Sequence, residues 1–399
     1  MRYARGFGFS AEKTVRRKNG IRRRSRLEYS RDATPTTFNL PMKPENPTIA
    51  VDVMGSDLGP EEMILGIKQA LAEDKSDFGI VVVGNEEVIT PILLRHNLIR
   101  EPRIKIYNAS EVIEMDEKPI QAIKTKKDSS MMRSIEIVKL GTANAVLSCG
   151  NTGALMAGGT IKLRTMAGIE RPALGTVIPG KTKNFIFIDV GASPDPKPES
   201  LVDNAILGAN YARIALGVKN PRVGLLSNGT EDGKGNMLVQ TAHRLFKAQE
   251  GVINYGGLLE GFNLFDGQFD VVVCDGFTGN VVLKSLESSI RMFKEILKEE
   301  VYRSWLSKIG MLLAKGAFVR MKKRLPIDKF SGAPLLGLNG LVVKAHGSSN
   351  RRQIAGAIEI TLRCLRKKMN DRIAEDVASL AAAREQNKLA ARQKEEGVS

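Results

Sequence analysis

The chain is 399 residues long, carries 60 Lys and Arg against 44 Asp and Glu, and has a formal net charge of +16. This length allows one large α/β unit or two domains, and no apolar stretch reaches the roughly 18–20 residues that span a bilayer. Three cysteines without paired spacing, Cys149, Cys274 and Cys364, indicate a reduced compartment and no structural zinc site.

Half of the excess positive charge lies in residues 1–41, which hold eleven Lys and Arg and three Asp and Glu. Residues 1–47 are predicted to be a disordered basic extension, because they have few apolar residues and no periodicity. The segment lacks the apolar region of a secretory signal. Three interpretations remain open: a nucleic-acid arm, an organellar transit peptide, or a segment that precedes a true start at Met42.

The predicted elements alternate between strand and helix. Strands are expected at residues 48–54, 80–83, 104–107, 143–148, 174–178, 185–190, 222–226 and 270–274. Helices are expected at residues 60–72, 86–98, 119–140, 153–163, 199–216 and 235–249. The 119–140 helix is interrupted at 124–130, a basic run that is either a solvated helix face or a basic edge of a site. Another strand, loop and helix start follows at 341–351, and a charged helical tail at 371–399.

Six of the strand-like runs end in small polar residues, and a helix-like stretch follows most of them. Buried parallel strands are continuous apolar runs, and ligands of such sheets bind outside the carboxyl ends of the strands. Small residues and helix N-termini let backbone N–H groups approach an anion. The pattern therefore predicts an α/β enzyme that acts on phosphate or another compact anion. The runs end at 52–55, 83–85, 148–153, 189–191, 226–230 and 274–276.

Residues 279–325 have a different texture, with apolar residues at helical spacing and interleaved cations. They are expected to form a protruding amphipathic helical pair. Acidic residues are absent from Tyr302 to Pro326. The apolar stripe is either core or dimer seam, or it lies on an anionic bilayer surface. The residues expected to touch a membrane are Trp305, Leu306, Ile309 and Leu313.

Four ordered motifs, at residues 49–60, 148–157, 271–280 and 339–349, resemble those of the phosphate acyltransferases of bacterial phospholipid synthesis (PlsX). The resemblance covers about residues 48–365. The first motif departs from the usual pattern at Val53 and Ser56, where Ala and Gly are usual. The stretch 193–199 lacks the usual Asn and Cys before Lys-Pro-Glu, and the loops at 227–230 and 255–258 also differ slightly.

The resemblance implies a three-layer α/β/α fold with a mostly parallel sheet over residues 48–370, like phosphate acetyltransferases and isocitrate-dehydrogenase-like enzymes. It implies a homodimer that makes acyl phosphate from long-chain acyl-acyl carrier protein and inorganic phosphate. The acyl phosphate would feed a membrane glycerol 3-phosphate acyltransferase. No metal and no cofactor are implied for the reaction, and no nucleic acid is expected as a partner. The expected location is cytoplasmic, with peripheral attachment to an anionic membrane surface.

The expected catalytic residues are Lys197 and His346. Lys197 lies between prolines, in a stiff loop that can aim a cation at phosphate, and His346 lies in a Gly/Ser loop after a strand. Each also has a plainer interpretation, as a surface lysine and a hydrogen-bonded loop histidine. His96 and His243 are assigned to helix surfaces.

The expected substrate-binding residues follow the strand ends. Some have a plainer alternative: helix capping for Asn151 and Thr152, and bracing of loops for Asp52 and Asp275. Lys344 could instead point to the outer face of its strand. The full set is Asp52, Gly55, Asn151, Thr152, Asn228, Asp275, Asn280, Lys344, Ser348 and Ser349.

Two other functions compete with this interpretation. One is a short-chain phosphate acyltransferase that uses acyl-coenzyme A, since its anion-binding loops would look alike. The other is a non-catalytic membrane- or nucleic-acid-binding protein, which the basic extension favours.

Overall fold

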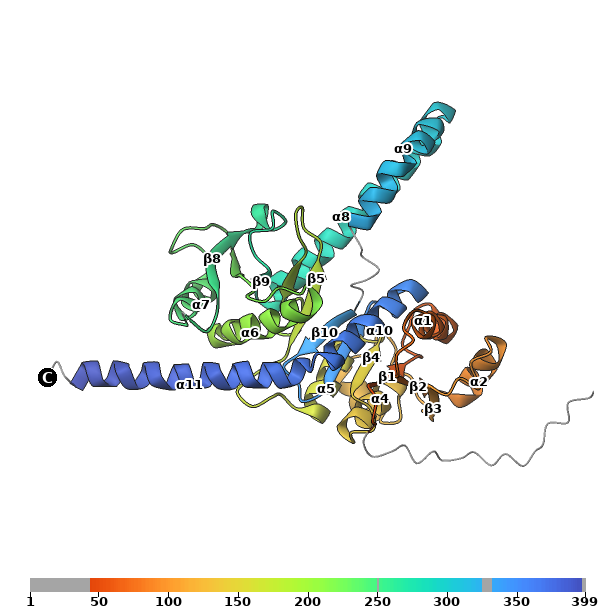
Figure 1. The fold of residues 1–399 in the computed structure, drawn as a ribbon, viewed down its shortest axis with the longest axis horizontal. Coiled ribbons are helices and arrows are strands. Elements are labelled where there is room, and N and C mark those ends of the chain that lie inside the picture. Colours follow the sequence, from red (N-terminus) through yellow and green to blue (C-terminus); the bar gives the residue numbers. More distant parts are fainter. Residues whose placement is uncertain (1–43, 250, 325–331, 397–399) are drawn as a thin grey trace, which may run out of the picture. The chain divides into compact units, whose positions relative to one another are not determined.

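The computed structural model of the protein describes residues 44–249, 251–324 and 332–396 (Figure 1). Most of the predicted basic extension therefore lies outside the described residues.

Eleven strands of the described chain form one sheet, in the order β3-β2-β1-β4-β11-β10-β5-β6-β9-β7-β8. All but three of the neighbouring pairs are parallel. The strands are β1 (Thr48–Asp52), β2 (Gly79–Gly84), β3 (Ile104–Asn108), β4 (Ala145–Ser148), β5 (Ala173–Ile178), β6 (Phe185–Ile188), β7 (Val223–Ser227), β8 (Tyr255–Glu260), β9 (Val271–Val273), β10 (Gly332–Leu336) and β11 (Leu341–Ala345).

The helices lie between the strands along the chain, as the alternating pattern predicts. They are α1 (Gly59–Glu73), α2 (Glu86–Arg95), α3 (Pro119–Thr125), α4 (Ser130–Lys139), α5 (Thr152–Leu163), α6 (Pro198–Ala215), α7 (Met237–Lys247), the short 3₁₀ helix η1 (Gly261–Asn263), α8 (Gly276–Arg303), α9 (Trp305–Arg324), α10 (Arg351–Arg366) and α11 (Met369–Glu396).

The sheet consists of two parallel halves that run in opposite directions. The three antiparallel pairs are consecutive: β11 with β10, β10 with β5, and β5 with β6. Strands β3, β2, β1, β4 and β11 therefore run one way, and β6, β9, β7 and β8 run the other. A sheet twists by about 20–25° at each strand, so the second half is turned nearly upside down relative to the first. Twist and reversal together bring the carboxyl ends of both halves to the same side.

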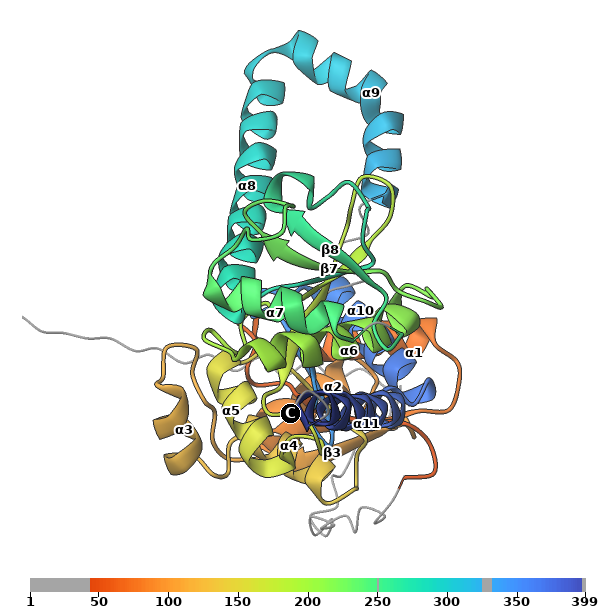
Figure 2. The ribbon, with the colours of Figure 1, turned by 90° about the vertical axis from the view of Figure 1, so that its left-hand side faces the viewer.

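Helices cover both faces of the sheet, which gives the three-layer α/β/α architecture that the sequence predicts. On one face, α1 packs on α2 and α10, and α6 packs on α7, α10 and α11. On the other face, α4 and α5 pack on the first half of the sheet, and α8 contacts β6. Helices α8 and α9 form a hairpin that extends beyond the sheet (Figure 2).

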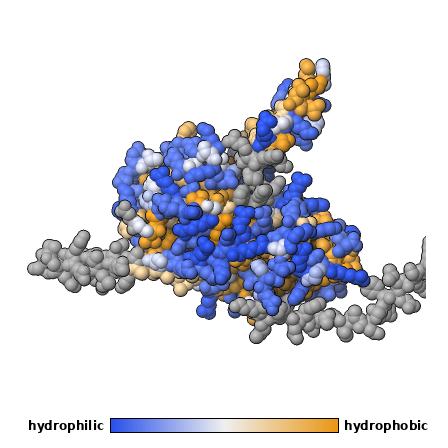
Figure 3. Space-filling view, viewed as in Figure 1, coloured by the Kyte–Doolittle hydropathy of each residue, from blue (hydrophilic) through white to orange (hydrophobic). Residues whose placement is uncertain are grey.

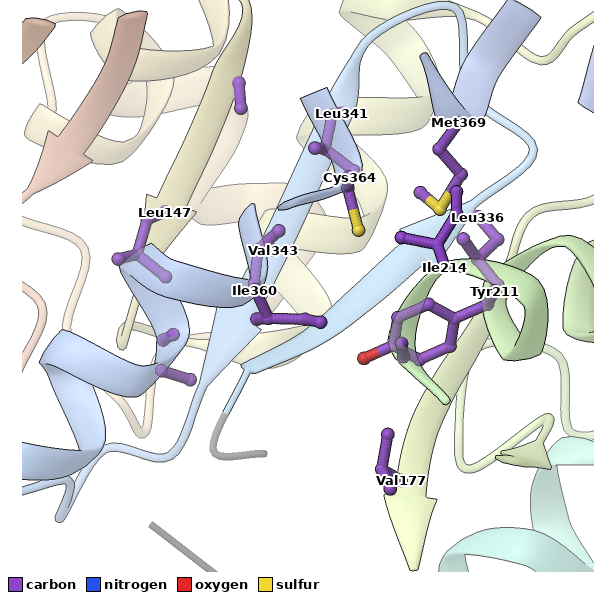
Figure 4. Packing of buried hydrophobic residues seen from close by; sticks show 14 of the residues in the cluster. Leu147, Val177, Tyr211, Ile214, Leu336, Leu341, Val343, Ile360, Cys364 and Met369 are labelled. Carbon is purple, nitrogen blue, oxygen red and sulfur yellow. The ribbon is translucent and has the colours of Figure 1, made fainter. Parts of the chain in front are cut away.

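The core continues across the junction between the two halves. The ring of Tyr211 on α6 is fully buried and lies near Leu336 of β10 and Val177 of β5 (Figure 4). Ile360 of α10 and Val343 of β11 are buried in the same cluster. One continuous hydrophobic core therefore spans the reversed strands. Cys149, Cys274 and Cys364 are all buried and unpaired.

Two strands were missed by sequence reasoning. The Gly-rich segment 332–340 forms β10 and the turn after it, and β8 includes Gly256 and Gly257. Gly and Pro weaken the apolar run that marks a buried strand, so neither segment has the expected pattern. The missed β10 is also one of the antiparallel strands, and the reversal of the sheet could not be deduced without it.

Helix α8 begins in close contact with the end of β6, which yields a test of the fold. A Cβ on Gly279 would lie 1.9 Å from the carbonyl oxygen of Asp189. We predict that Gly279→Ala destabilises the protein by about 1–3 kcal/mol, because the backbone must move apart. Gly310→Ala is the matched control, since nothing lies within 4 Å of its Cβ. It should be neutral or stabilising by up to about 1 kcal/mol. Equal urea midpoints for the two variants would contradict the packing of α8 on β6.

Candidate active site

Three neighbouring strand ends bring Asp52, Ser148 and Lys344 into register. Asp52 is buried and accepts hydrogen bonds from Ser148 Oγ at 2.7 Å and from Ser130 Oγ at 2.6 Å. Burial raises the pKa of Asp52, although these hydrogen bonds act in the opposite direction. Since its oxygens are occupied by protein donors, Asp52 braces the loops after β1 and β4.

The loops after β1 and β4 touch backbone to backbone. A Cβ on Gly55 would lie 2.7 Å from Gly150 Cα, and the Gly150 N–H donates to Ser148 Oγ at 3.0 Å. A side chain at position 55 would therefore push the two loops apart. Position 55 therefore requires glycine, because a Cβ there would not fit between the two loops.

Asn151 has every polar atom of its side chain engaged. Its Oδ1 accepts from the Ala154 N–H at 3.0 Å and caps α5, while its Nδ2 donates to the carbonyls of Met115 and Glu117, each at 3.0 Å. The capping alternative thus describes Asn151. Thr152, the first residue of α5, is exposed beside it.

Lys344 is a partly buried cation at the end of β11. Its Nζ donates to the carbonyl oxygen of Cys149 at 2.9 Å and also contacts the carbonyl of Ala345. Burial lowers the pKa of Lys344 to about 8; Asp57 and Asp52 oppose this shift, and the positive charge of Lys284 adds to it. Lys344 therefore titrates close to neutral pH.

The loop after β11 holds His346, Ser348 and Ser349. The exposed His346 ring lies with Nδ1 2.9 Å from Ser348 Oγ. Ser349 is buried, and its hydroxyl has no hydrogen-bond partner among the described residues. The loop packs against the one after β1, because the Asp57 N–H donates to the Gly347 carbonyl at 3.0 Å.

The other half of the sheet contributes through the first turns of α8. Asp275 caps this helix by accepting from the Thr278 N–H at 2.8 Å, so it too is a brace. Asn280 lies beside Gly191, the residue after the β6 end, with its Cβ 3.6 Å from the position of a Gly191 Cβ. One turn further along α8, Lys284 forms an ion pair of 2.8 Å with Glu287.

Lys284 of α8 acts electrostatically on groups of the other half of the sheet, and it was missed by sequence reasoning. Burial lowers the pKa of His346, and the positive charge of Lys284 lowers it further. Lys284 also lowers the pKa of Lys344. A residue of α8 therefore lies close enough to the β11 loop to act on both groups. Its spacing from Asn280, four residues on one helix, was the available signal, because such residues share a helix face.

Two other expected site residues are held elsewhere. Lys197 precedes α6; its side chain is 68% exposed and pairs with Glu170 at 2.8 Å. Asn228 follows β7 and accepts from the Gly235 N–H at 2.8 Å. Among the described residues, no hydrogen bond or ion pair joins either side chain to the His346 loop.

Asp189 braces the loop that leads to Lys197, and it was not among the expected site residues. Its carboxylate accepts four backbone N–H groups, from Leu174, Gly191, Ala192 and Ser193, at 2.7–3.0 Å. Burial nevertheless raises its pKa.

The assignment of His243 to a helix surface was wrong. His243 is buried, and its ring nitrogens lie 2.6 Å from Tyr255 Oη and 2.9 Å from Asp232 Oδ1. The strand β8, which was missed from sequence, supplies the tyrosine that encloses it. His96 pairs with Glu61 at 2.8 Å at the end of α2.

The tip of the α8–α9 hairpin is strongly apolar at its surface (Figure 3). The side chains of Trp305, Leu306, Ile309 and Leu313 are 69%, 64%, 46% and 83% exposed. Over the described residues, no helix is long and apolar enough to cross a membrane. Over the same part of the chain, no group of His, Cys, Asp and Glu residues could hold a metal ion.

The geometry thus places two lysines, a histidine and the unpaired hydroxyl of Ser349 where the strand ends of both halves meet. Such a group of cations and hydrogen-bond donors suits a small anion and a reaction that develops negative charge on oxygen. Cavities detected elsewhere, such as one of about 240 Å³ lined by Ala205, Arg213 and Asp376, share no residue with this group.

The comparisons with known proteins agree with this chemistry. Residues 47–372 match the family described as "Fatty acid synthesis protein". Proteins named "Phosphate acyltransferase" from Halothermothrix orenii and Bacillus cereus are 41% and 43% identical to this chain. The alignments cover 82% and 80% of this chain and 98% and 95% of those proteins.

Two solved structures share the fold. The phosphotransacetylase of Streptococcus pyogenes has a TM-score of 0.56 at 16% identity, covering 82% of this chain and 96% of that one. The EutD phosphotransacetylase of Staphylococcus aureus has a TM-score of 0.51 at 15% identity, covering 81% of this chain and 95% of that one.

Proposed function

The chain belongs to the phosphate acyltransferase family, and from this premise we propose that it transfers a long-chain acyl group from acyl-acyl carrier protein to inorganic phosphate. The observation that carries the proposal is the grouping of Lys284, Lys344 and His346 where the strand ends of both halves meet. The acyl phosphate would then serve a membrane glycerol 3-phosphate acyltransferase.

In the proposed reaction, an oxygen of hydrogen phosphate attacks the thioester carbonyl carbon. The new C–O bond forms, the C–S bond breaks, and the electron pair leaves with sulfur. The proton of hydrogen phosphate ends on that sulfur, so the atoms and charges balance. A thiolate is a good leaving group, and the step needs no covalent enzyme intermediate.

The environment of each site residue indicates which part of this reaction it can serve. Lys284 and Lys344 attract the phosphate dianion, and the hydroxyl of Ser349 and the amide of Asn280 are available as ligands. Lys344, with a pKa of about 8, is close to the ordinary thiol pKa of about 8.5, so it can return a proton to the sulfur. Asp52, Asn151 and Asp275 act through the loops that they brace.

The function is tested by supplying phosphate with a long-chain acyl-acyl carrier protein or with acetyl-coenzyme A, and trapping acyl phosphate with hydroxylamine. We expect product with the carrier-protein substrate. Product with acetyl-coenzyme A alone would support the short-chain enzyme instead. Absence of product with either thioester would favour a non-catalytic binding protein.

We predict that His346→Ala lowers turnover by about 10²–10³-fold, the usual cost of losing one transition-state donor or charge. The sequence predicts the same loss for Lys197→Ala, whereas the structure pairs Lys197 with Glu170 and joins it to no residue of the His346 loop among those described. Turnover is measured at saturating phosphate, and circular dichroism checks the fold. Lys219→Ala, at an exposed lysine, is the matched control. Near-normal turnover would show that the altered residue lies outside the site. The measurement is most informative for Lys197, because its side chain already forms an ion pair with Glu170.

We also propose that the chain forms a homodimer that binds an anionic membrane surface through the α8–α9 hairpin. The interleaved cations of α9 would each add on the order of 1 kcal/mol near anionic lipid. An insoluble acyl phosphate would then be released beside the membrane enzyme that consumes it.

Replacing Leu306, Ile309 and Leu313 with Glu should abolish sedimentation with vesicles of anionic phospholipid. The apolar contact is lost, and the anionic lipid repels the introduced carboxylates. The dimer and the soluble activity should remain. Phe262→Glu is the control, since this side chain is 89% exposed and lies outside the hairpin. If the triple variant falls apart into monomers, the stripe is a subunit seam and the membrane proposal is wrong.

A further inference from the structure

The protonation of the His346 ring can be assigned from its neighbours. Its Nδ1 lies 2.9 Å from Ser348 Oγ and 3.4 Å from the Ser348 backbone nitrogen, which is hydrogen-bonded to it. A backbone N–H can only donate, so Nδ1 must accept. In a neutral ring the proton is therefore on Nε2.

The Nε2–H group is free to meet a substrate. Over the described residues no hydrogen bond to Nε2 is formed, and the side chain is exposed. Nδ1 is thus hydrogen-bonded within the protein, and Nε2 has no partner among the described residues. The occupied nitrogen is fixed by the loop itself, within two residues of the histidine.

The surrounding charges keep this ring neutral. Partial removal of the ring from water lowers the pKa of His346 most, the positive charge of Lys284 lowers it further, and Lys344 acts in the same direction. Glu287 and Asp57 act in the opposite direction without reversing the shift. These four groups come from α8, β11 and the loop after β1. A third positive charge beside two lysines is unfavourable, so the unliganded ring is mostly uncharged at pH 7.

We propose that Ser348 is a positioning residue that holds His346 as the Nε2–H tautomer, so that the neutral ring donates a hydrogen bond to the thioester carbonyl oxygen. This inference rests on the proposed function. The donor strengthens its hydrogen bond as that oxygen gains negative charge in the transition state. His346 keeps its proton throughout, and the proton that reaches sulfur comes from phosphate through Lys344.

The assignment separates the two substrates in space. The cations Lys284 and Lys344 take the phosphate, which is doubly charged, and the uncharged ring takes the carbonyl, which is neutral until the attack. An imidazolium would instead compete with the lysines for phosphate. The rival role, a charged phosphate ligand, makes opposite predictions about the ring's protonation.

The first test reads the tautomer directly. Protein with ¹⁵N-labelled histidine has only three imidazole rings, those of His96, His243 and His346, and therefore six ring-nitrogen signals. The pair that disappears in His346→Gln belongs to His346. At pH 7.5 we expect a proton on Nε2 and none on Nδ1, both without ligand and with saturating inorganic phosphate. A proton on Nδ1, or an imidazolium in the presence of phosphate, would overturn the proposal. This measurement stands whether or not the protein turns over acyl-carrier protein.

The second test compares Ser348→Ala with Ser348→Thr. Removing the hydroxyl should shift the ring toward a mixture of tautomers and lower kcat about tenfold, the effect of losing one hydrogen bond. The KM for phosphate should change little, because the lysines remain. Threonine should restore both the tautomer and kcat. If Ser348→Ala keeps the wild-type tautomer and kcat, or if only the KM for phosphate rises, Ser348 does not position the histidine. If the wild-type protein itself forms no acyl phosphate, that result would count against the proposed function and not against the tautomer of His346.

Discussion

The reversal of strand direction at β10 and β5 is the constraint on which the site depends. In a sheet with one direction throughout, the twist would carry the carboxyl ends of its two halves to opposite sides. The three consecutive antiparallel pairs cancel that effect. Lys284 of α8 therefore lies near Lys344 of β11 and His346 of the loop after it, although three strands separate β11 from β9, the strand that precedes α8. Buried hydrophobic residues around Tyr211 pack at this junction.

Buried carboxylates organise the site and do not themselves face a ligand. Asp52 and Asp189 end strands in opposite halves, and each accepts donors from the loops around it. Their hydrogen bonds offset much of the cost of burying a charge, and burial still dominates both pKa shifts. An anion site would otherwise be weakened by nearby negative charge. Enclosing the carboxylates leaves lysines, hydroxyls and N–H groups at the open ends.

The sequence was sufficient for the fold class and for the position of the small polar loops at the strand ends, because buried parallel strands and the residues after them follow from local chemistry. It was insufficient for side-chain roles. Asn151 and Asp275 cap helices with the same residue types that could bind phosphate, and only contacts distinguish the two uses. Lys284 was missed because it lies on a long amphipathic helix among other cations, where only its spacing from Asn280 distinguishes it. Its importance depends on the reversal of strand direction in the sheet, and that reversal could not be deduced because β10 was not predicted.

Burial and mutual repulsion set the charge of the empty site. Lys344 titrates near neutral pH, and the His346 ring is disfavoured as a cation, since each feels burial and the charge of Lys284. A phosphate dianion would relieve this repulsion and raise the pKa of Lys344, so the bound lysine would carry a proton when the thiolate leaves. The same phosphate that acts as nucleophile would thus prepare the acid that completes its own transfer. A histidine that is uncharged and fixed in one tautomer avoids competing for that anion, which leaves its donor for the carbonyl.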